Sequence, residues 1–176
     1  MSSLPSSTRQ LIERLGATDQ LAQQDQSIGL AAERAVLRQQ LAALSAYKTE
    51  QLYLLGEAAV LLENALLLAD QPQTHLQLSA QLADLYLQFF KVTQEQRYLM
   101  VAGQILKPLS HSNHLSISWQ LLRLHALGNQ PALTQYWLKK LLGSGQVTWT
   151  QLDDLAELVP MRGLDWLQQL QQRYQH

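Results

Sequence analysis

The stretch SIGLAAERAVLRQQLAALSAYKTEQLYLLGEAAVLLENALLLA, residues 27–69, decides the fold class of this chain. Apolar residues recur every three or four positions from Val36 to Leu44, which is the spacing of one face of an α-helix. A single helix of about 40 residues is rare in globular proteins, and Thr49 opens a second run of helical character. The stretch therefore predicts two long helices that are separated near residues 45–49.

The composition of the whole chain favours helix in the same way. Of the 176 residues, 39 are Leu and 26 are Gln, whereas Val, Ile, Phe and Thr are scarce. Leu and Gln keep most of their rotamer freedom in helices, and the scarce residues include those that favour strands. We therefore expect an all-α protein.

Turn and capping signals divide the remainder of the chain into further helices. The strongest is Pro72, within a polar stretch at residues 70–74, because proline cannot continue a helix. Thr93 and Gln96 match a capping box for a helix starting at Gln94, and Thr150 is the expected cap of a later helix. Together these signals predict about nine helices, in three parts: a disordered tail at 1–6, N-terminal helices at 7–70, and helical hairpins at 71–176.

Charge and cysteine content exclude several classes of function. The formal net charge is -1 and 15% of the residues are charged, so nothing pulls the protein towards nucleic acid. The chain has no cysteine, which excludes disulfides and thiolate chemistry. The longest apolar stretches near Leu62 are interrupted by Glu63 and Asn64, and no signal peptide is visible at the N-terminus. We expect a cytoplasmic protein without membrane insertion.

Neither catalytic nor cofactor motifs occur in the sequence. His111 and His114 have a spacing that a metal could use, but no third ligand lies near them in the sequence. Asp153 and Asp154 are adjacent at an expected helix start, where the helix dipole alone favours negative charge. No phosphate-binding loop or nucleophile motif is present. We therefore expect neither enzymatic activity, nor a cofactor, nor a bound metal.

The second half of the chain has a weak internal period. Connections after residue 72 are short, which forces neighbouring helices to run antiparallel. The first helices of successive pairs are expected to start near Thr74, Asn113 and Thr150, about 35 to 40 residues apart. This spacing is close to the 34-residue period of tetratricopeptide repeats.

Several residues carry a resemblance to that family. Leu82, Ala83 and Tyr86 resemble the large, small and aromatic positions of the first helix of such a repeat. The pattern of the second helix is matched by Leu99, Ala102 and Pro108. A second repeat is resembled by Leu127-Gly128-Asn129 and Trp137. Gly103 and Gln120 depart from the pattern. The resemblance covers about 100 residues from position 75, and a generic helical bundle is the competing interpretation.

The resemblance implies a short right-handed solenoid of stacked hairpins, with the N-terminal helices as its cap. In that family, residues on the first helix of each repeat face a groove that binds a segment of another protein. In this sequence the corresponding residues are Gln77, Gln81, Asp84, Gln88, Trp119, Leu122 and His125. Gln side chains suit the role because they can hydrogen-bond a peptide backbone without carrying a charge.

Two hypotheses for function follow. The first is a non-enzymatic adaptor or chaperone-like protein that binds a segment of a partner protein in a helical groove. The second is a structural subunit that self-associates, or joins a larger assembly, through the helices of residues 28–69. They differ in where exposed apolar surface is expected: between residues 75 and 142 for the first, and between Val36 and Leu68 for the second.

Overall fold

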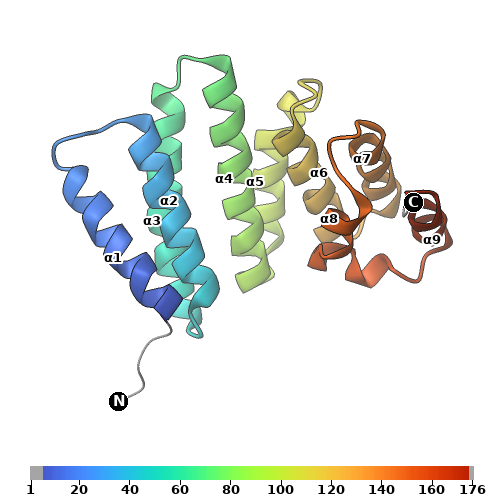
Figure 1. The fold of residues 1–176 in the computed structure, drawn as a ribbon, viewed down its shortest axis with the longest axis horizontal. Helices are drawn as coiled ribbons and strands as arrows, with labels where there is room; N and C mark the ends of the chain where they lie inside the picture. The colour runs from blue at the N-terminus through green and yellow to red at the C-terminus, as the bar shows by residue number, and fades with distance from the viewer. Residues whose placement is uncertain (1–5, 175–176) are drawn as a thin grey trace. The chain divides into compact units, whose positions relative to one another are not determined.

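The computed structural model describes residues 6–174, and over this range the protein contains helices and no strand (Figure 1). The prediction of an all-α protein is confirmed. The nine α-helices of the described range are α1 (Ser6–Leu21), α2 (Ile28–Leu44), α3 (Lys48–Leu68), α4 (Pro72–Thr93), α5 (Gln96–Leu106), α6 (Leu115–Leu127), α7 (Pro131–Gly143), α8 (Trp149–Asp153) and α9 (Asp165–Tyr174). Two short 3-10 helices join them, η1 (Lys107–Leu109) and η2 (Ala156–Met161).

The chain forms two compact units, Met1–Tyr98 and Leu99–His176, which meet within α5. The sequence predicted a division after residue 70, but α4 packs against α3 and belongs to the first unit. The reason is that apolar residues of α3 pack against α2 on one side and against α4 on the other. Of the tail predicted at residues 1–6, only Ser6 lies within the described residues, and α1 begins there.

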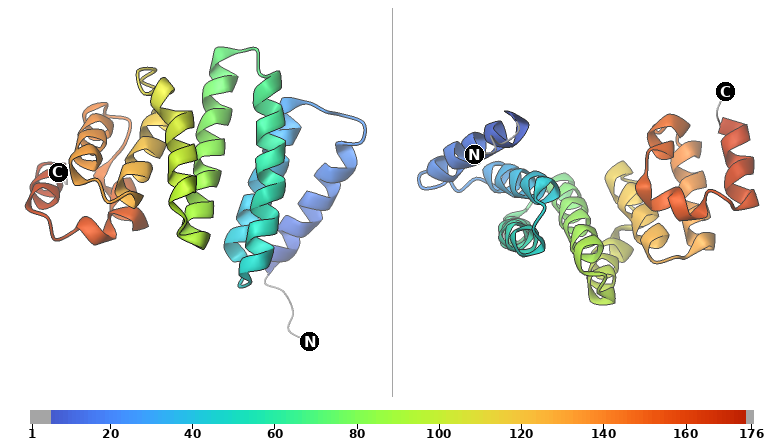
Figure 2. Two further views of the ribbon diagram at one scale, coloured as in Figure 1. Left: turned by 180° about the vertical axis from the view of Figure 1, so that it is seen from behind. Right: turned by 90° about the horizontal axis from the view of Figure 1, so that it is seen from below.

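In the first unit, helices α1 to α4 follow one another in alternating directions (Figures 1 and 2). Its core is built from leucine and alanine, and the fully buried side chains include Leu55, Leu62 and Leu85. Each such leucine contributes about 1.5–3 kcal/mol through removal of its side chain from water. The predicted break at residues 45–49 is confirmed, because α2 ends at Leu44 and α3 begins at Lys48.

Ion pairs join α1 to α2. The Asp19 carboxylate accepts hydrogen bonds from Arg34 at 2.6 Å and from Arg38 at 2.9 Å, and the Arg38 side chain is only 9% exposed. Partial burial raises the pKa of Asp19, but the hydrogen bonds and charges of the two arginines outweigh this and lower the pKa below its usual 3.8. Because burial of a charge is tolerated only when it is paired, this cluster fixes the position of α1 on α2.

In the second unit, α6 and α7 form an antiparallel hairpin (Figure 2), and α9 packs against α7. The turn is the predicted Leu127-Gly128-Asn129: α6 ends at Leu127 and Asn129 has a positive φ of 51°. A Cβ atom on Gly128 would lie 3.2 Å from the carbonyl oxygen of Leu124, which explains the glycine. The element η2 contacts α6 through an ion pair between Arg123 and Glu157.

Two capping predictions were wrong in position. Thr93 is the last residue of α4, and Gln94 caps that helix in the left-handed conformation, so α5 begins only at Gln96. The hydroxyl of Thr93 donates to the carbonyl oxygen of Phe89 in its own helix instead of capping the next one. The later capping box is formed by Thr148 with Gln151, two residues before the predicted cap at Thr150.

Among the described residues, α3 alone is long and apolar enough to cross a membrane by length and composition. The sequence-based expectation that no apolar stretch is long enough to span a membrane treated Glu63 and Asn64 as the end of the stretch. In this structure α3 packs between α2 and α4, and its buried residues are Leu55, Ala58, Ala59, Leu62 and Ala65. Because 28% of the apolar stretch is buried, helix packing accounts for only part of its apolar character.

The ion pairs between α1 and α2 predict how substitutions of their arginines change the free energy of unfolding. The substitution Arg38→Ala should lower the free energy of unfolding by about 1–2 kcal/mol, because it leaves the half-buried Asp19 with one partner fewer. Urea denaturation followed by circular dichroism measures this change. The control Arg9→Ala removes an exposed pair with Glu13 and should change stability by less than about 0.5 kcal/mol. Equal effects of the two substitutions would contradict the structural role of Arg38.

Candidate functional site

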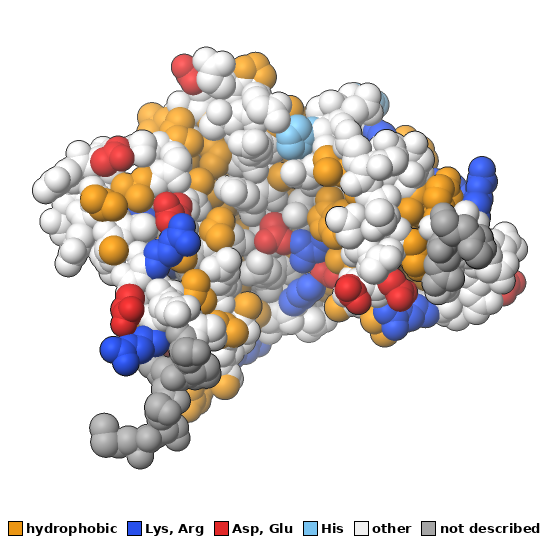
Figure 3. Space-filling view, in the orientation of Figure 1, with side chains coloured by type: hydrophobic (Ala, Val, Ile, Leu, Met, Phe, Trp, Pro, Cys, Tyr) orange, Lys and Arg blue, Asp and Glu red, His pale blue; other side chains and the backbone are white. Residues whose placement is uncertain are grey.

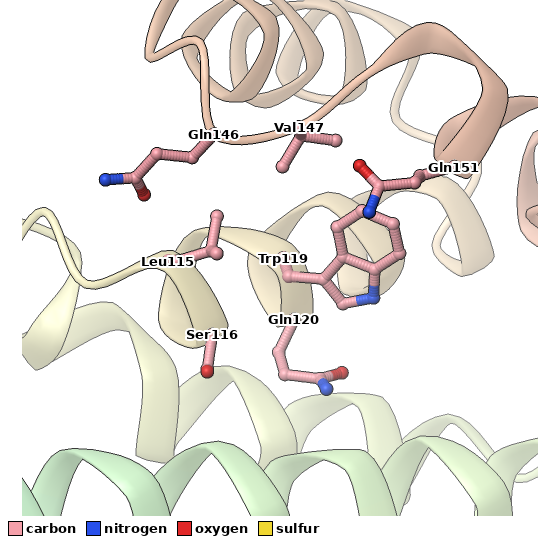
Figure 4. A pocket seen from close by; sticks show the side chains of 7 residues that line it. All are labelled: Leu115, Ser116, Trp119, Gln120, Gln146, Val147 and Gln151. Atoms are coloured by element: carbon pink, nitrogen blue, oxygen red, sulfur yellow. The ribbon is translucent and has the colours of Figure 1, made fainter.

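A pocket opens on the surface of the second unit (Figure 4). It has a volume of about 250 Å³, smaller than the roughly 300–1,000 Å³ of pockets that hold drug-sized ligands. Its lining comes from α6, from the segment before α8, and from α8 itself: Leu115, Ser116, Trp119, Gln120, Gln146, Val147 and Gln151. We call this the Trp119 pocket. Its size suits one or two amino-acid side chains.

Local structure explains why these residues share a surface. Residues 115, 116, 119 and 120 stand one and four positions apart, which places them on one face of α6. Opposite them, Val147 is buried and leads into Thr148, whose backbone N–H donates to the Gln151 side-chain oxygen at 2.9 Å. This capping box fixes the start of α8 and holds Gln151 at the pocket.

Trp119 differs from two other tryptophans of the second unit. Trp137 and Trp149 are buried, each 6% exposed, and contribute to the core. Trp119 is half-buried at the rim of α6 and keeps part of its indole accessible within the pocket. A partly exposed tryptophan beside an apolar hollow is a feature common in protein-binding surfaces.

The four predicted residues of the first unit lie on α4. Gln77 is exposed, and Gln81, Asp84 and Gln88 are half-buried. Asp84 accepts hydrogen bonds from Gln88 at 2.9 Å and from Gln39 of α2 at 3.3 Å, so it joins two helices of its own unit. Their assignment to a partner-binding face stays a prediction.

The three predicted residues of the second unit lie on α6 and have different environments. Only Trp119 reaches the pocket. Leu122 is fully buried and His125 is 7% exposed, so both lie in the core and present no surface to a partner in this structure. The helical period explains the difference: residues three and six positions after Trp119 rotate towards α7.

His125 is held in its neutral form. Burial lowers the pKa of its imidazole below 6.5, and the charge of Lys107 lowers it further, against an opposing effect of Gln130. The Nδ1 atom lies 2.6 Å from the Gln130 side-chain oxygen, so we assign the proton to Nδ1. The histidine therefore ties the end of α6 to the start of α7.

A second apolar feature is the outer face of α3. Tyr53, Val60 and Leu67 stand seven residues apart and are 66%, 57% and 85% exposed. The predicted site residues did not include them. Their spacing in the sequence was the available signal, but the pattern does not show which face of an apolar helix is left without a neighbour. We call these three residues the α3 stripe.

A second hollow, of about 250 Å³, lies where the α1–α2 connection meets the end of α3. Leu61 and Leu68 line it on one side and Arg34 on the other. Arg34 is already paired with Asp19 at 2.6 Å, so its charge is neutralised. Asp25, which accepts hydrogen bonds from Ser27, also lines this hollow, so the lining is mixed polar and apolar.

No metal-binding cluster comes together within residues 6–174. No group of three or more His, Asp or Glu side chains converges there, so His111 and His114 gain no third ligand among these residues. Burial and a 2.6 Å hydrogen bond to Glu63 raise the pKa of Tyr86 to about 12. That shift follows from packing of α4 on α3.

The surface shown in Figure 3 carries its charges as small adjacent groups of opposite sign among uncharged and apolar side chains. On this face, no broad region of one sign is present. This agrees with the formal net charge of -1.

His125 predicts a pH dependence of stability. Because its pKa is lower in the folded state than the unfolded value of 6.5, the unfolded chain binds the proton more readily. The contribution of His125 is therefore complete above pH 6.5 and is lost as the pH falls below it. Urea denaturation at pH 7.5 and 5.5 should show a smaller loss for His125→Gln than for the wild type. The same loss in both proteins would refute this assignment.

Comparison with known proteins assigns no family to the chain. It matches no family model, no curated protein and no solved structure. The function must therefore be inferred from the protein's own surface, in which the Trp119 pocket and the α3 stripe are the two most prominent apolar features described above.

Proposed function

We propose that this protein is a non-enzymatic interaction module, an adaptor or chaperone-like protein, that binds a segment of a partner protein. The observation that carries the proposal is the Trp119 pocket, a hollow of side-chain size with an accessible indole in its wall. The few side chains that fill such pockets supply most of the affinity of a protein interface. The Gln side chains around it supply hydrogen bonds without a charge to desolvate.

The proposal extends to a tetratricopeptide-like arrangement of the hairpins. Support comes from the α6–α7 pair, whose turn lies at the Leu127-Gly128-Asn129 positions of the resemblance. Ala83 and Ala102 are fully buried, as expected of small residues where helices approach closely. Cytoplasmic location and the absence of membrane insertion remain expectations from the sequence.

A test of this function compares Trp119→Ala with the wild type in affinity capture from the source cell, with identification by mass spectrometry. We expect one partner to be lost on the substitution, because the anchor of the pocket is removed. Tyr136→Ala is the control, since Tyr136 is an exposed aromatic residue of the same unit outside the pocket. Loss of the partner in both variants, or in neither, contradicts the proposal, provided that circular dichroism shows equal helicity.

A second candidate function is supported by the α3 stripe. In this alternative the protein is a structural subunit that self-associates through the helices of residues 28–69. Val60 lies midway between Tyr53 and Leu67, so two antiparallel α3 helices related by a twofold axis at Val60 would place each Tyr53 against the partner's Leu67. The stripe would then be buried in a dimer.

The oligomeric state tests this alternative. Self-association through α3 predicts a dimer in sedimentation velocity, which Val60→Lys should convert to a monomer because two like charges would meet at the axis. Val159→Lys is the matched control, since Val159 is 50% exposed in the second unit. A wild-type protein that stays monomeric at about 100 μM excludes the alternative, as does a dimer that survives Val60→Lys.

A further inference from the structure

The two glutamines on either side of Trp119 are held in fixed orientations. The side-chain oxygen of Gln120 accepts a hydrogen bond from the Arg123 guanidinium at 3.0 Å. The side-chain oxygen of Gln151 accepts from the Thr148 backbone N–H at 2.9 Å and from the Thr148 hydroxyl at 3.2 Å. In both amides the oxygen is therefore occupied within the protein.

The amide orientation follows from these donors. Arginine and a backbone N–H can only donate, so an oxygen must face them in each case and the NH₂ group must lie at the other end. Neither NH₂ group donates a hydrogen bond to another described residue. Two lining residues from different elements, α6 and α8, therefore carry unused hydrogen-bond donors, and Figure 4 shows Gln120 and Gln151 on opposite sides of Trp119.

The arginine that orients the Gln120 side chain belongs to a buried ion pair. Arg123 donates to Glu157 at 2.9 Å, and the two side chains are 12% and 3% exposed. This pair compensates the arginine charge, so the pocket gains a fixed amide without a net positive charge beside it. None of the seven lining residues is itself charged.

We propose that the Trp119 pocket binds a neutral, extended backbone segment of the partner protein, through one apolar side chain and the carbonyl oxygens that flank it. The side chain would lie against Trp119, Leu115 and Val147, and the carbonyl oxygens would accept hydrogen bonds from the NH₂ groups of Gln120 and Gln151. This inference rests on the proposed function and adds to it the chemistry of the ligand: hydrogen-bond acceptors around an apolar group. A carboxylate is disfavoured because no unpaired positive charge lines the pocket.

The smallest probe with this chemistry is N-acetyl-leucine-N-methylamide, which carries an isobutyl group between two peptide carbonyls. Its binding is measured by two-dimensional ¹H–¹⁵N NMR of the full chain. We expect shifts of the Trp119 indole N–H and of the side-chain NH₂ signals of Gln120 and Gln151, with a dissociation constant in the millimolar range expected of so small a ligand.

The decisive variants are Gln120→Glu and Gln151→Glu. Glutamate has the shape of glutamine and keeps the oxygen that Arg123 or Thr148 requires, and it is itself a usual capping-box residue. It exchanges the NH₂ donor for a second acceptor oxygen and adds one negative charge. Each substitution should weaken binding of the diamide about tenfold, since an acceptor of the probe loses its partner. Gln168→Glu, an exposed glutamine of α9, adds the same charge elsewhere and should leave binding unchanged.

Two further probes separate the parts of the inference. Isoamyl alcohol has the apolar group without the peptide carbonyls, and its weaker binding should be the same in the wild type and in both glutamate variants. N-acetyl-leucine, which carries a carboxylate, should bind more weakly than the neutral diamide. Unchanged diamide binding in Gln120→Glu and Gln151→Glu, or tighter binding of the carboxylate, overturns the inference.

These results are distinguishable from failure of the proposed function. If Trp119→Ala loses a partner but the two glutamate variants bind the diamide normally, the interaction module stands and the donor pattern is refuted. If the diamide shifts the expected signals but Trp119→Ala keeps every partner, the pocket chemistry stands and the proposed function fails.

Discussion

The ion pair between Arg123 and Glu157 is the interaction on which the arrangement of the second unit depends. Both side chains are nearly removed from solvent, and breaking a buried ion pair typically costs about 3–5 kcal/mol. The pair joins α6 to η2 through two residues that are 34 positions apart in the chain. Arg123 also donates a hydrogen bond to the side-chain oxygen of Gln120. The same arginine therefore fixes the packing of η2 and the orientation of the Gln120 amide at the pocket.

Much of the helical organisation could be predicted from the sequence, because the signals are local. The break between Leu44 and Lys48 follows from spacing, and the chemistry of proline marks the turn before α4, although that helix begins at Pro72 and not near the predicted Thr74. The two misplaced caps show the limit. The capping pattern occurs at Thr93 and Thr150, which were predicted, and also at Thr148, which forms the cap. The pattern alone does not indicate where the preceding helix ends. Gln94 ended α4 in a left-handed conformation, which sequence spacing does not reveal.

The candidate site was harder to predict, since it depends on contacts between distant residues. Trp119 could be named from the sequence because a large aromatic on a first helix is notable by itself. Gln146 and Val147 could not, because they reach the pocket from a segment whose path depends on the packing of α6 and α7. Leu122 and His125 were assigned to a surface but lie in the core, since helical spacing alone does not show which face meets α7.

Gln151 has two roles, and their combination has a thermodynamic consequence. It accepts the hydrogen bonds that start α8, a helix of five residues, and its other end lies at the pocket. So short a helix is marginal alone and opens locally at a low free-energy cost. A ligand held by Gln151 binds only while that residue is in its capping position, so occupancy must suppress the opening of α8 by linkage. Slower amide exchange at the start of α8 would accordingly accompany binding, even though the backbone N–H groups of that helix touch no ligand.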